Sequence, residues 1–505
     1  MTEIGRGLKT STSPGYDDLR SSVVKSVICL ISAPLSHIFN LSLSSGIVPL
    51  GLKVAKVTPI FKSGNPHDIC NYRPISVLPT FSKILERIVY NRLFKFLSNF
   101  NILSNQQFGF RPGCSTDMAL IHLTDLITSS LARKQCTAGV FMDLSKAFDT
   151  IDHNILLSKL SFYGVRGCAC KWFSSYLAER QQYTVVNKLS SVRRVITHGV
   201  PQGSILGPLL FLVYINDLHN SSSLLSFLSF ADDTTIIYSD STSQSLTQTL
   251  NSELIKVSSW FKSNKLSLNH GKTNYIIFNK CNNPNPKIVI NIDGTPITKV
   301  RSTKFLGVIV NDKLNWSNHI SFVSKTISKN VGVLSKLRTF LPPCTLFSLY
   351  NALILPLLNY CNVVWGSSTH NQLHPLITLQ KRAIRICTLS HPRDHTAPLF
   401  LRLHTLTLTD IHKFHIGIFM YKFVNKLLPA TFSSYFSAVH DVHCYNTRSR
   451  NNLYIPFSRT SYCIRTLRFQ GTRLWNGLSE EIKSKSSVGG FKASFKSLLV
   501  SLNGV

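Results

Sequence analysis

Residues 224–238 read LLSFLSFADDTTIIY and place two adjacent carboxylates, Asp232 and Asp233, between two apolar runs. Both runs have the composition of β-strands, so the Ala-Asp-Asp step between them predicts a tight hairpin turn. An isolated Asp-Asp turn is usually structural, because acidic side chains hydrogen-bond the local backbone. A third carboxylate further upstream, Asp143, also ends an apolar, strand-like run. Three carboxylates at strand ends indicate a shared site.

The composition is strongly basic. Lysine and arginine number 55 against 23 aspartates and glutamates, which gives a formal net charge of +32. So large an excess indicates a polyanionic partner, either nucleic acid or an anionic membrane surface. The length of 505 residues predicts about two to four domains, and a hydrophobic content of 44% is ample for buried cores. Because carboxylates are scarce, those that follow apolar strands are the stronger site candidates.

Twelve cysteines are scattered without a repeating spacing, which predicts reduced thiols in a nuclear or cytoplasmic protein that is not secreted. Cys387, His391 and His395 fall at four-residue intervals, a spacing that could place zinc ligands on one helix face. Pro392 would interrupt such a helix, and no Cys-x-x-Cys pair lies nearby, so zinc is not expected.

A membrane is not expected as a partner. The N-terminus lacks a charged region followed by an apolar core and a small-residue cleavage site. The longest apolar stretch that we identify, 205–215, is too short to span a bilayer and contains Gly207 and Pro208. Nucleic acid is therefore the predicted partner.

Hydrophobic periodicity predicts an α+β architecture. Helices are expected at 21–44 (interrupted near Pro34), 82–97, 115–133, 152–162, 169–178, 204–218 and 245–262. Strands are expected at 53–62, 137–143, 182–187, 192–198, 224–230, 234–239, 274–279, 287–292 and 304–310. From 318 onward the pattern is mostly helical, and 440–505 is basic with interleaved aromatic residues, a combination suited to contacts with nucleic acid or to a structural domain.

Carboxylates clustered in a basic protein indicate a divalent-metal site. Mg²⁺ prefers carboxylate oxygens and keeps water and phosphate ligands. Two such ions can stabilise the attacking and the leaving oxygen of a phosphoryl transfer. Bound metal would also relieve the repulsion between closely packed aspartates.

Other segments fit a phosphate-containing ligand. Residues 199–208, GVPQGSILGP, form a Gly/Pro-rich turn before an apolar helix, which lets backbone approach a ligand closely but also occurs as an ordinary turn. Lys272 could reach a triphosphate, and Arg73 and Arg111 offer the guanidinium fork that suits phosphate.

Together these segments resemble a reverse transcriptase. The matching blocks, in order, are NYRPIS at 71–76, GFR at 109–111, DLSKAFD at 143–149, GVPQGS at 199–204, FADD at 230–233, NHGKT at 269–273 and FLG at 305–307. FADD with SKAFD is more similar to the polymerases of non-LTR, LINE-like (jockey/CR1-type) retrotransposons than to the retroviral form. The resemblance covers about residues 50–310 and continues more loosely to about 400.

The resemblance implies a right-hand polymerase, with fingers and a palm with an antiparallel sheet at 51–310 and a helical thumb-like region at 311–400. An N-terminal extension at 1–50 and a basic, mostly helical C-terminal region at 401–505 would flank it. The implied partners are an RNA template, a DNA primer or target, and deoxynucleoside triphosphates.

The same resemblance assigns the site residues. Asp143 and Asp232 would bind two Mg²⁺ ions, for which Mn²⁺ could substitute, and Asp233 would complete the catalytic carboxylates. Phe148 would exclude a ribonucleotide 2′-hydroxyl. The remaining implied contacts are Arg73, Arg111 and Lys272 to phosphates, Gln202 and Gly203 to template and nucleotide, and Phe305, Leu306 and Gly307 as primer grip. Asp149 and Asp152 belong to the same block, and we expect them to cap a helix N-terminus.

Elements of this type usually carry an endonuclease ahead of the polymerase, whereas the first residues here with any similarity to the family, SPGYD at 13–17, lie close to the start of this chain. We therefore expect RNA-directed DNA synthesis without that endonuclease. The alternative is a truncated, catalytically unproductive remnant that binds nucleic acid through charge, with steeply salt-dependent affinity. RNA-templated RNA synthesis is disfavoured by Phe148.

Overall fold

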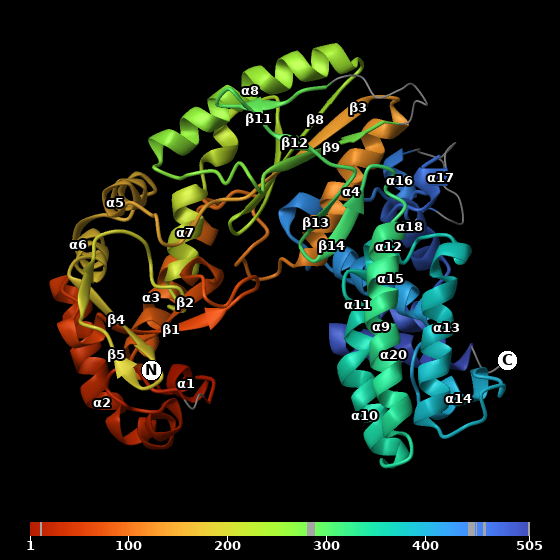
Figure 1. Cartoon of the computed structure of the whole chain (residues 1–505), viewed down its shortest axis with the longest axis horizontal. Helices are drawn as coiled ribbons and strands as arrows, with labels where there is room; N and C mark the ends of the chain where they lie inside the picture. The colour runs from red at the N-terminus through yellow and green to blue at the C-terminus, as the bar shows by residue number, and fades with distance from the viewer. Residues whose placement is uncertain (11–12, 280–287, 443–449, 451, 458–460, 503–505) are drawn as a thin grey trace.

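A computed structural model of the protein describes residues 1–10, 13–279, 288–442, 450, 452–457 and 461–502. Its elements form an arch (Figure 1). One limb contains the N-terminal helices and a small sheet, the crown contains a larger sheet with flanking helices, and the other limb is helical and C-terminal. The larger sheet carries the three predicted carboxylates.

The larger sheet has the strand order β12-β9-β3-β8-β7. Its strands are β3 (Cys136–Met142), β7 (Ser226–Phe230), β8 (Asp233–Asp240), β9 (Asn274–Phe278) and β12 (Thr298–Lys299). β3 lies at the centre, antiparallel to both β8 and β9, and all of its residues are buried. The strands expected at 137–143, 224–230, 234–239 and 274–279 are confirmed, with small shifts at their ends.

Alternating side chains of this sheet enter two hydrophobic cores. On one face, Val140 and Ile236 join the core that contains α8 (Ser243–Ser263). On the other face, Phe141 and Ile237 join the core that contains α4 (Thr116–Ala132) and the C-terminal helices. A register slip of one residue would exchange the two sets of side chains, so burial on both faces fixes where each strand ends.

The smaller sheet has the order β2-β1-β4-β5, with β6 paired to β4. Its strands are β1 (Val54–Phe61), β2 (Tyr72–Val77), β4 (Arg180–Val186), β5 (Leu189–Ser190) and β6 (Arg194–Ile196). Helices around it are α1 (Thr2–Arg6), α2 (Ser21–Ser45), α3 (Thr80–Asn99), α5 (His153–Phe162), α6 (Gly167–Leu177) and α7 (Gly207–Ile215). The predicted elements of this limb are present.

The interruption expected near Pro34 is wrong, because α2 continues through that residue. Ile28 before the proline and Leu35 and Phe39 after it are all buried in one core, and this packing outweighs the lost backbone hydrogen bond. Among the described residues, α2 is also the one helix with the length and apolar composition that a membrane crossing requires. The apolar stretch at 205–215 is therefore not the longest, although a packed core helix meets the same two criteria.

Residues 304–310 were expected as one strand and instead belong to a hairpin, β13 (Ser302–Phe305) and β14 (Val308–Asn311). Leu306 and Gly307 form its turn with φ angles of 45° and 81°. A leucine rarely adopts a positive φ, so composition did not predict this turn. Of the strand expected at 287–292, residue 287 lies outside the described residues, and β10 (Asn291–Ile292) pairs with β11 (Thr295–Pro296).

The C-terminal limb is helical, as expected. Its longer helices are α9 (Ser317–Leu337), α10 (Pro343–Leu353), α13 (His370–Cys387), α15 (Leu408–Val424), α18 (Leu467–Asn476) and α20 (Val488–Ser501). Shorter ones are α11 (Leu355–Asn359), α12 (Asn362–Trp365), α14 (Ala397–Arg402), α16 (Val439–Val442), α17 (Ser461–Ile464) and α19 (Glu480–Lys483). One hydrophobic core runs from α4 through these helices to α20.

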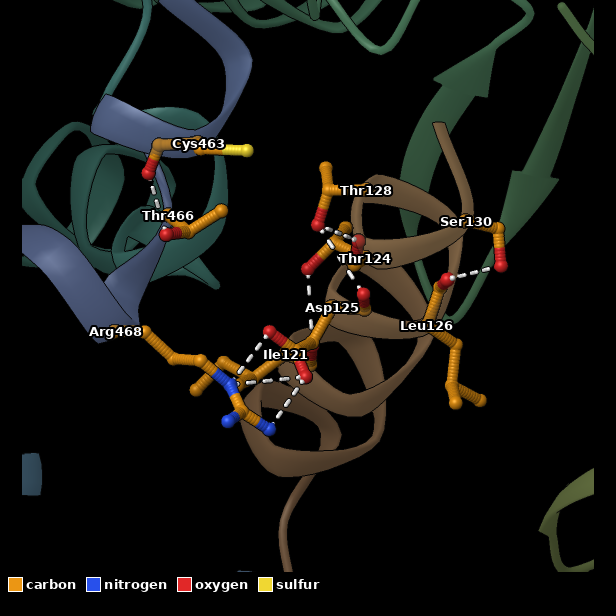
Figure 2. A network of polar contacts seen from close by, with 9 residues as sticks. All are labelled: Ile121, Thr124, Asp125, Leu126, Thr128, Ser130, Cys463, Thr466 and Arg468. Atoms are coloured by element: carbon orange, nitrogen blue, oxygen red, sulfur yellow. Dashed lines mark hydrogen bonds and ion pairs between the residues drawn. The ribbon is translucent and has the colours of Figure 1, made fainter. Parts of the chain in front are cut away.

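An ion pair also joins the C-terminal limb to α4 (Figure 2). The Arg468 guanidinium on α18 donates from Nε to Oδ1 and from a terminal nitrogen to Oδ2 of Asp125, each at 3.0 Å. The same guanidinium lies 4.2 Å from the ring centroid of Tyr435. Residues far apart in the chain therefore fold against the sheet that carries the carboxylates.

The structure places Cys387, His391 and His395 on no common helix. α13 ends at Cys387, whose buried thiol donates to the Leu346 carbonyl, and the two histidines follow in exposed backbone.

Candidate active site

Strand register brings the three aspartates to one end of the larger sheet. Met142, the last residue of β3, pairs with Thr234 of β8, so Asp143 follows beside the start of β8. Phe230 pairs with Asp233, which leaves Ala231 and Asp232 as the hairpin turn. The predicted turn is confirmed, with Asp233 as the first residue of β8. Ala231 has φ 58°, a left-handed conformation that costs a non-glycine residue about 1–2 kcal/mol.

The acidic cluster is incompletely neutralised. Loss of hydration, followed by the negative charges of Asp232 and Asp143, raises the pKa of Asp233 to about 6. Loss of hydration and the charge of Asp143 also raise the pKa of Asp232, although backbone hydrogen bonding, Arg73 and Lys62 act in the opposite direction. Lys272 Nζ lies 3.9 Å from Asp143 Oδ2, and its side chain is 65% exposed, so this pair is weak.

These donors fit a divalent cation. Carboxylate oxygens are the ligands that Mg²⁺ prefers, and the mutual repulsion of the aspartates is what a bound cation would offset. Within the described part of the chain, no three His, Cys, Asp or Glu side chains form a complete cation site. Asp143 and Asp232 would therefore supply part of the coordination, with water and phosphate oxygens as the remaining ligands.

A cleft of about 790 Å³ opens beside the carboxylates. Its lining combines three acidic residues with four basic ones, namely Asp143, Asp149 and Asp232 with Lys62, Arg73, Lys146 and Lys272. The predicted residues Phe148 and Gln202 also line it, and so do Tyr72 and Asn269. Lys62 was not among our candidates, although it is the last residue of the strand expected at 53–62.

The ring of Phe148 is held between two other aromatic rings. It stacks on Phe211 of α7 with centroids 4.6 Å apart and an interplanar angle of 25°. Phe110 approaches its edge at 6.0 Å. A ring fixed in this way presents a constant surface to the cleft.

The loop at 199–204 is anchored on both sides. Gln202 Nε2 donates to both carboxylate oxygens of Asp149, each at 3.0 Å, and the Ser76 amide donates to the Gln202 carbonyl at 2.7 Å. Gly203 has φ 121°, and a Cβ there would lie 2.5 Å from the Ser76 carbonyl oxygen. Gly203 therefore packs on β2, and glycine is required by both its conformation and this contact.

Of the two aspartates that we expected to cap a helix, Asp152 does so and Asp149 does not. Asp152 caps α5, accepting from the Asn154 and Ile155 amides at 2.9 and 3.0 Å. The capping role predicted for Asp149 is wrong, because its carboxylate accepts from Gln202 instead. Burial raises the pKa of Asp149, against the opposing effects of Gln202 and Lys146.

Lys272 belongs to a loop that is tied to Asp143. The Asn269 amide donates to the Asp143 carbonyl at 2.8 Å, and the Asp143 amide donates to Thr273 Oγ1 at 3.4 Å. The Lys272 side chain extends from this loop into the cleft lining.

Arg111 and the 305–307 turn lie outside the cleft lining. The Arg111 guanidinium donates to the backbone carbonyls of Ser104 and Gln107. Phe305 is buried, with its ring centroid 5.6 Å from that of Phe141. The Tyr360 hydroxyl donates to the Leu306 carbonyl at 2.7 Å, which fixes the turn against the helical limb.

Comparison with known proteins agrees with this geometry. Residues 61–310 match the family described as reverse transcriptase (RNA-dependent DNA polymerase). The curated relatives include the probable RNA-directed DNA polymerase from transposon BS of Drosophila melanogaster, 29% identical over 80% of this chain and 46% of the relative. The RNA-directed DNA polymerase from mobile element jockey of the same species is 28% identical over 78% of this chain and 43% of its own length.

Among solved structures, an apo telomerase from Candida tropicalis truncated from its C-terminal domain aligns with a TM-score of 0.35 and 12% identity, over 59% of this chain and 61% of that one. Residues 61–310 thus form a reverse transcriptase domain. The predicted resemblance to non-LTR retrotransposon reverse transcriptases is confirmed. It spans less than half the length of these curated relatives.

Proposed function

We propose that this chain is an RNA-directed DNA polymerase of a non-LTR retrotransposon, which extends a primer 3′-hydroxyl on an RNA template with deoxynucleoside triphosphates. The observation that carries this proposal is the shared cleft, in which Asp143 and Asp232 face Lys62, Arg73 and Lys272. This combination suits a triphosphate that arrives with bound cations, because the carboxylates attract the cations and the basic side chains attract the phosphates.

Asp143 and Asp232 would hold Mg²⁺, with Mn²⁺ as a substitute, and Asp233 would add negative charge to the cluster. When bound, two such ions neutralise phosphate charge and stabilise the attacking and leaving oxygens of the transfer. Arg73, Lys62 and Lys272 would orient the triphosphate. Phe148 would contact the sugar, and the loop with Gln202 would contact the template and the incoming base.

The architecture supports a right-hand arrangement for this activity. The smaller sheet and its helices would act as fingers, the larger sheet as palm and the helices from α9 onward as thumb. The backbone of the Leu306–Gly307 turn would lie against the primer. A DNA primer or target strand and an RNA template are the proposed partners. The scattered spacing of the cysteines in the sequence supports a nuclear or cytoplasmic location.

Primer extension on an RNA template with Mg²⁺ tests the proposal. We expect product from the natural chain and at least about a thousand-fold less from Asp232→Asn, since metal-ion stabilisation contributes several kcal/mol. Asp18→Asn is the matched control, because Asp18 is exposed and its positive φ suits asparagine. Salt-dependent RNA binding by folded protein without any synthesis would instead identify a non-catalytic remnant.

A further inference from the structure

The loop at 104–111 directly contacts the end of β7 and the Ala231–Asp232 turn that follows it. The Ser229 amide donates to the Gln106 carbonyl at 2.9 Å, and the Phe108 amide donates to the Ser229 carbonyl at 2.8 Å. Gln107 therefore forms a parallel bridge with Ser229, just before the turn that carries Asp232. This bridge brings the Gln107 side chain to the backbone of the turn.

The carboxamide of Gln107 completes the hydrogen bonding of Ala231. Oε1 accepts from the Ala231 amide at 2.9 Å and from the Gly109 amide at 2.8 Å, while Nε2 lies 3.4 Å from the Ala231 carbonyl, a longer contact. The Gln107 residue is 8% exposed, so water does not compete freely for these bonds. The side chain thus links the turn to the loop through a single oxygen.

Gly109 allows this close approach. A Cβ at position 109 would lie 2.1 Å from the Ala231 nitrogen and 2.8 Å from the Phe230 carbonyl carbon, so only glycine fits between loop and turn. The loop itself is held by Arg111, which donates to the Ser104 and Gln107 carbonyls. It is also held by Asn216, which accepts from the Ser104 amide at 2.8 Å.

We infer that Gln107 is a positioning residue that fixes the Ala231–Asp232 turn and so orients the Asp232 carboxylate toward divalent metal. Ala231 adopts a left-handed conformation that is unfavourable for a side chain, and the hydrogen bonds from Gln107 hold its amide and carbonyl in place. The GFR block, which sequence reasoning assigned to phosphate through Arg111, instead supports this turn. The metal-directed part of the inference rests on the proposed function.

Hydrogen exchange of the natural chain, Gln107→Leu and Gln107→Glu tests the positioning without any metal. We expect the Ala231 amide, followed in peptides that cover 225–235, to exchange about tenfold faster in Gln107→Leu. Gln107→Glu retains an accepting oxygen and should keep most of the protection. Gln106→Leu is the matched control, because its neighbouring carboxamide makes no hydrogen bond to the turn and its backbone bond to Ser229 survives the substitution.

Mn²⁺ binding to protein without nucleic acid, followed by the electron paramagnetic resonance signal of free Mn²⁺, provides the second readout. Loss of a group that orients a metal ligand weakens binding by about 10–100-fold, so Gln107→Leu should bind Mn²⁺ more weakly by that factor and Gln106→Leu should not. The inference would be overturned if amide hydrogens at 225–235 exchanged at the rate of the natural chain in both Gln107 variants. Unchanged Mn²⁺ affinity in a folded Gln107→Leu would also overturn it. Absence of primer extension by the natural chain would contradict the proposed function instead and would leave the exchange test intact.

Discussion

Gln202 donates from its Nε2 to both carboxylate oxygens of Asp149, at 3.0 Å each, and so joins the loop at 199–204 to the turn that follows β3. Asp149 therefore fixes the orientation of a side chain that lines the cleft. The sequence had predicted that Asp149 caps a helix, but the structure shows that it orients the Gln202 side chain. It also predicts that Asp149 influences nucleotide addition through Gln202.

Substitution of Asp149 should reduce the kcat/KM of single-nucleotide addition in a graded way. Asp149→Ala removes both acceptors, and the loss of about 1–2 kcal/mol corresponds to a factor of about 5–30. Asp149→Asn keeps one carbonyl acceptor and should lose less. Steady-state addition on one fixed RNA template measures both, and equal activity of natural chain and Asp149→Ala would show that Gln202 needs no such support.

Phe148→Val should weaken discrimination between deoxyribonucleotides and ribonucleotides. The natural ring is stacked on Phe211 at 4.6 Å and cannot move away from a 2′-hydroxyl, whereas valine leaves space there. We expect the ratio of kcat/KM values for the two sugars to fall about tenfold or more. Phe162→Val, at an 83% exposed position, should leave the ratio unchanged. Unaltered discrimination in an active Phe148→Val enzyme would exclude the sugar contact.

The sequence predicted those site features that depend on local pattern. The strand that precedes Asp143 and the two strands that flank Asp232 are largely apolar, and the Ala-Asp step between paired strands leaves only a hairpin as a connection. The matching blocks at 71–76, 143–149, 199–204 and 269–273 all contribute side chains to one cleft, whereas Arg111 and the 305–307 turn lie outside its lining. Local pattern and topology are enough to locate this site.

Features that depend on tertiary packing were not predictable in the same way. Pro34 breaks an isolated helix but not α2, where buried residues on both sides hold the helix together. Arg111 offers a guanidinium that suits phosphate, yet one of its terminal nitrogens donates to backbone carbonyls of its own loop, and the residue lies outside the cleft lining. The side chain of Gln107 carried no signal in one sequence, since its partners come from a strand turn more than a hundred residues later.

Mild acid should destabilise the fold through His319. Burial, followed by the charge of Lys304, lowers the pKa of this histidine to about 4, and its Nε2 has no hydrogen-bond partner among the described residues. The unfolded chain keeps an ordinary histidine pKa of about 6.5, so below that pH it takes up a proton that the folded chain does not bind. The free energy of unfolding should therefore fall by about 2 kcal/mol between pH 8 and pH 5 from this group.

Urea denaturation at the two pH values measures the effect, with His319→Gln as the variant that cannot titrate. The loss of stability on acidification should be smaller in His319→Gln than in the natural chain. His370→Gln, at an exposed position, should behave like the natural chain. An identical acid response in all three proteins would show that His319 titrates normally in the folded chain.

Removal of the Arg468–Asp125 pair should destabilise the joint between the C-terminal limb and α4. Asp125 is 11% exposed at its side chain, so Arg468→Ala leaves a carboxylate with little access to water and also removes the guanidinium from the Tyr435 ring. Because the Arg468 side chain is 41% exposed, solvent screens part of the interaction, and we expect a loss of about 2 kcal/mol.

A double-mutant cycle with Arg468→Ala and Asp125→Ala separates this pair from its surroundings. The double variant should be less destabilised than the sum of the two single variants, because removing Asp125 abolishes the cost of leaving it unpaired. Arg473→Ala, an exposed position on the same helix, controls for the loss of any arginine from α18. A coupling energy of zero would mean that the hydrophobic core from α4 to α20 joins the limb to the sheet without help from the ion pair.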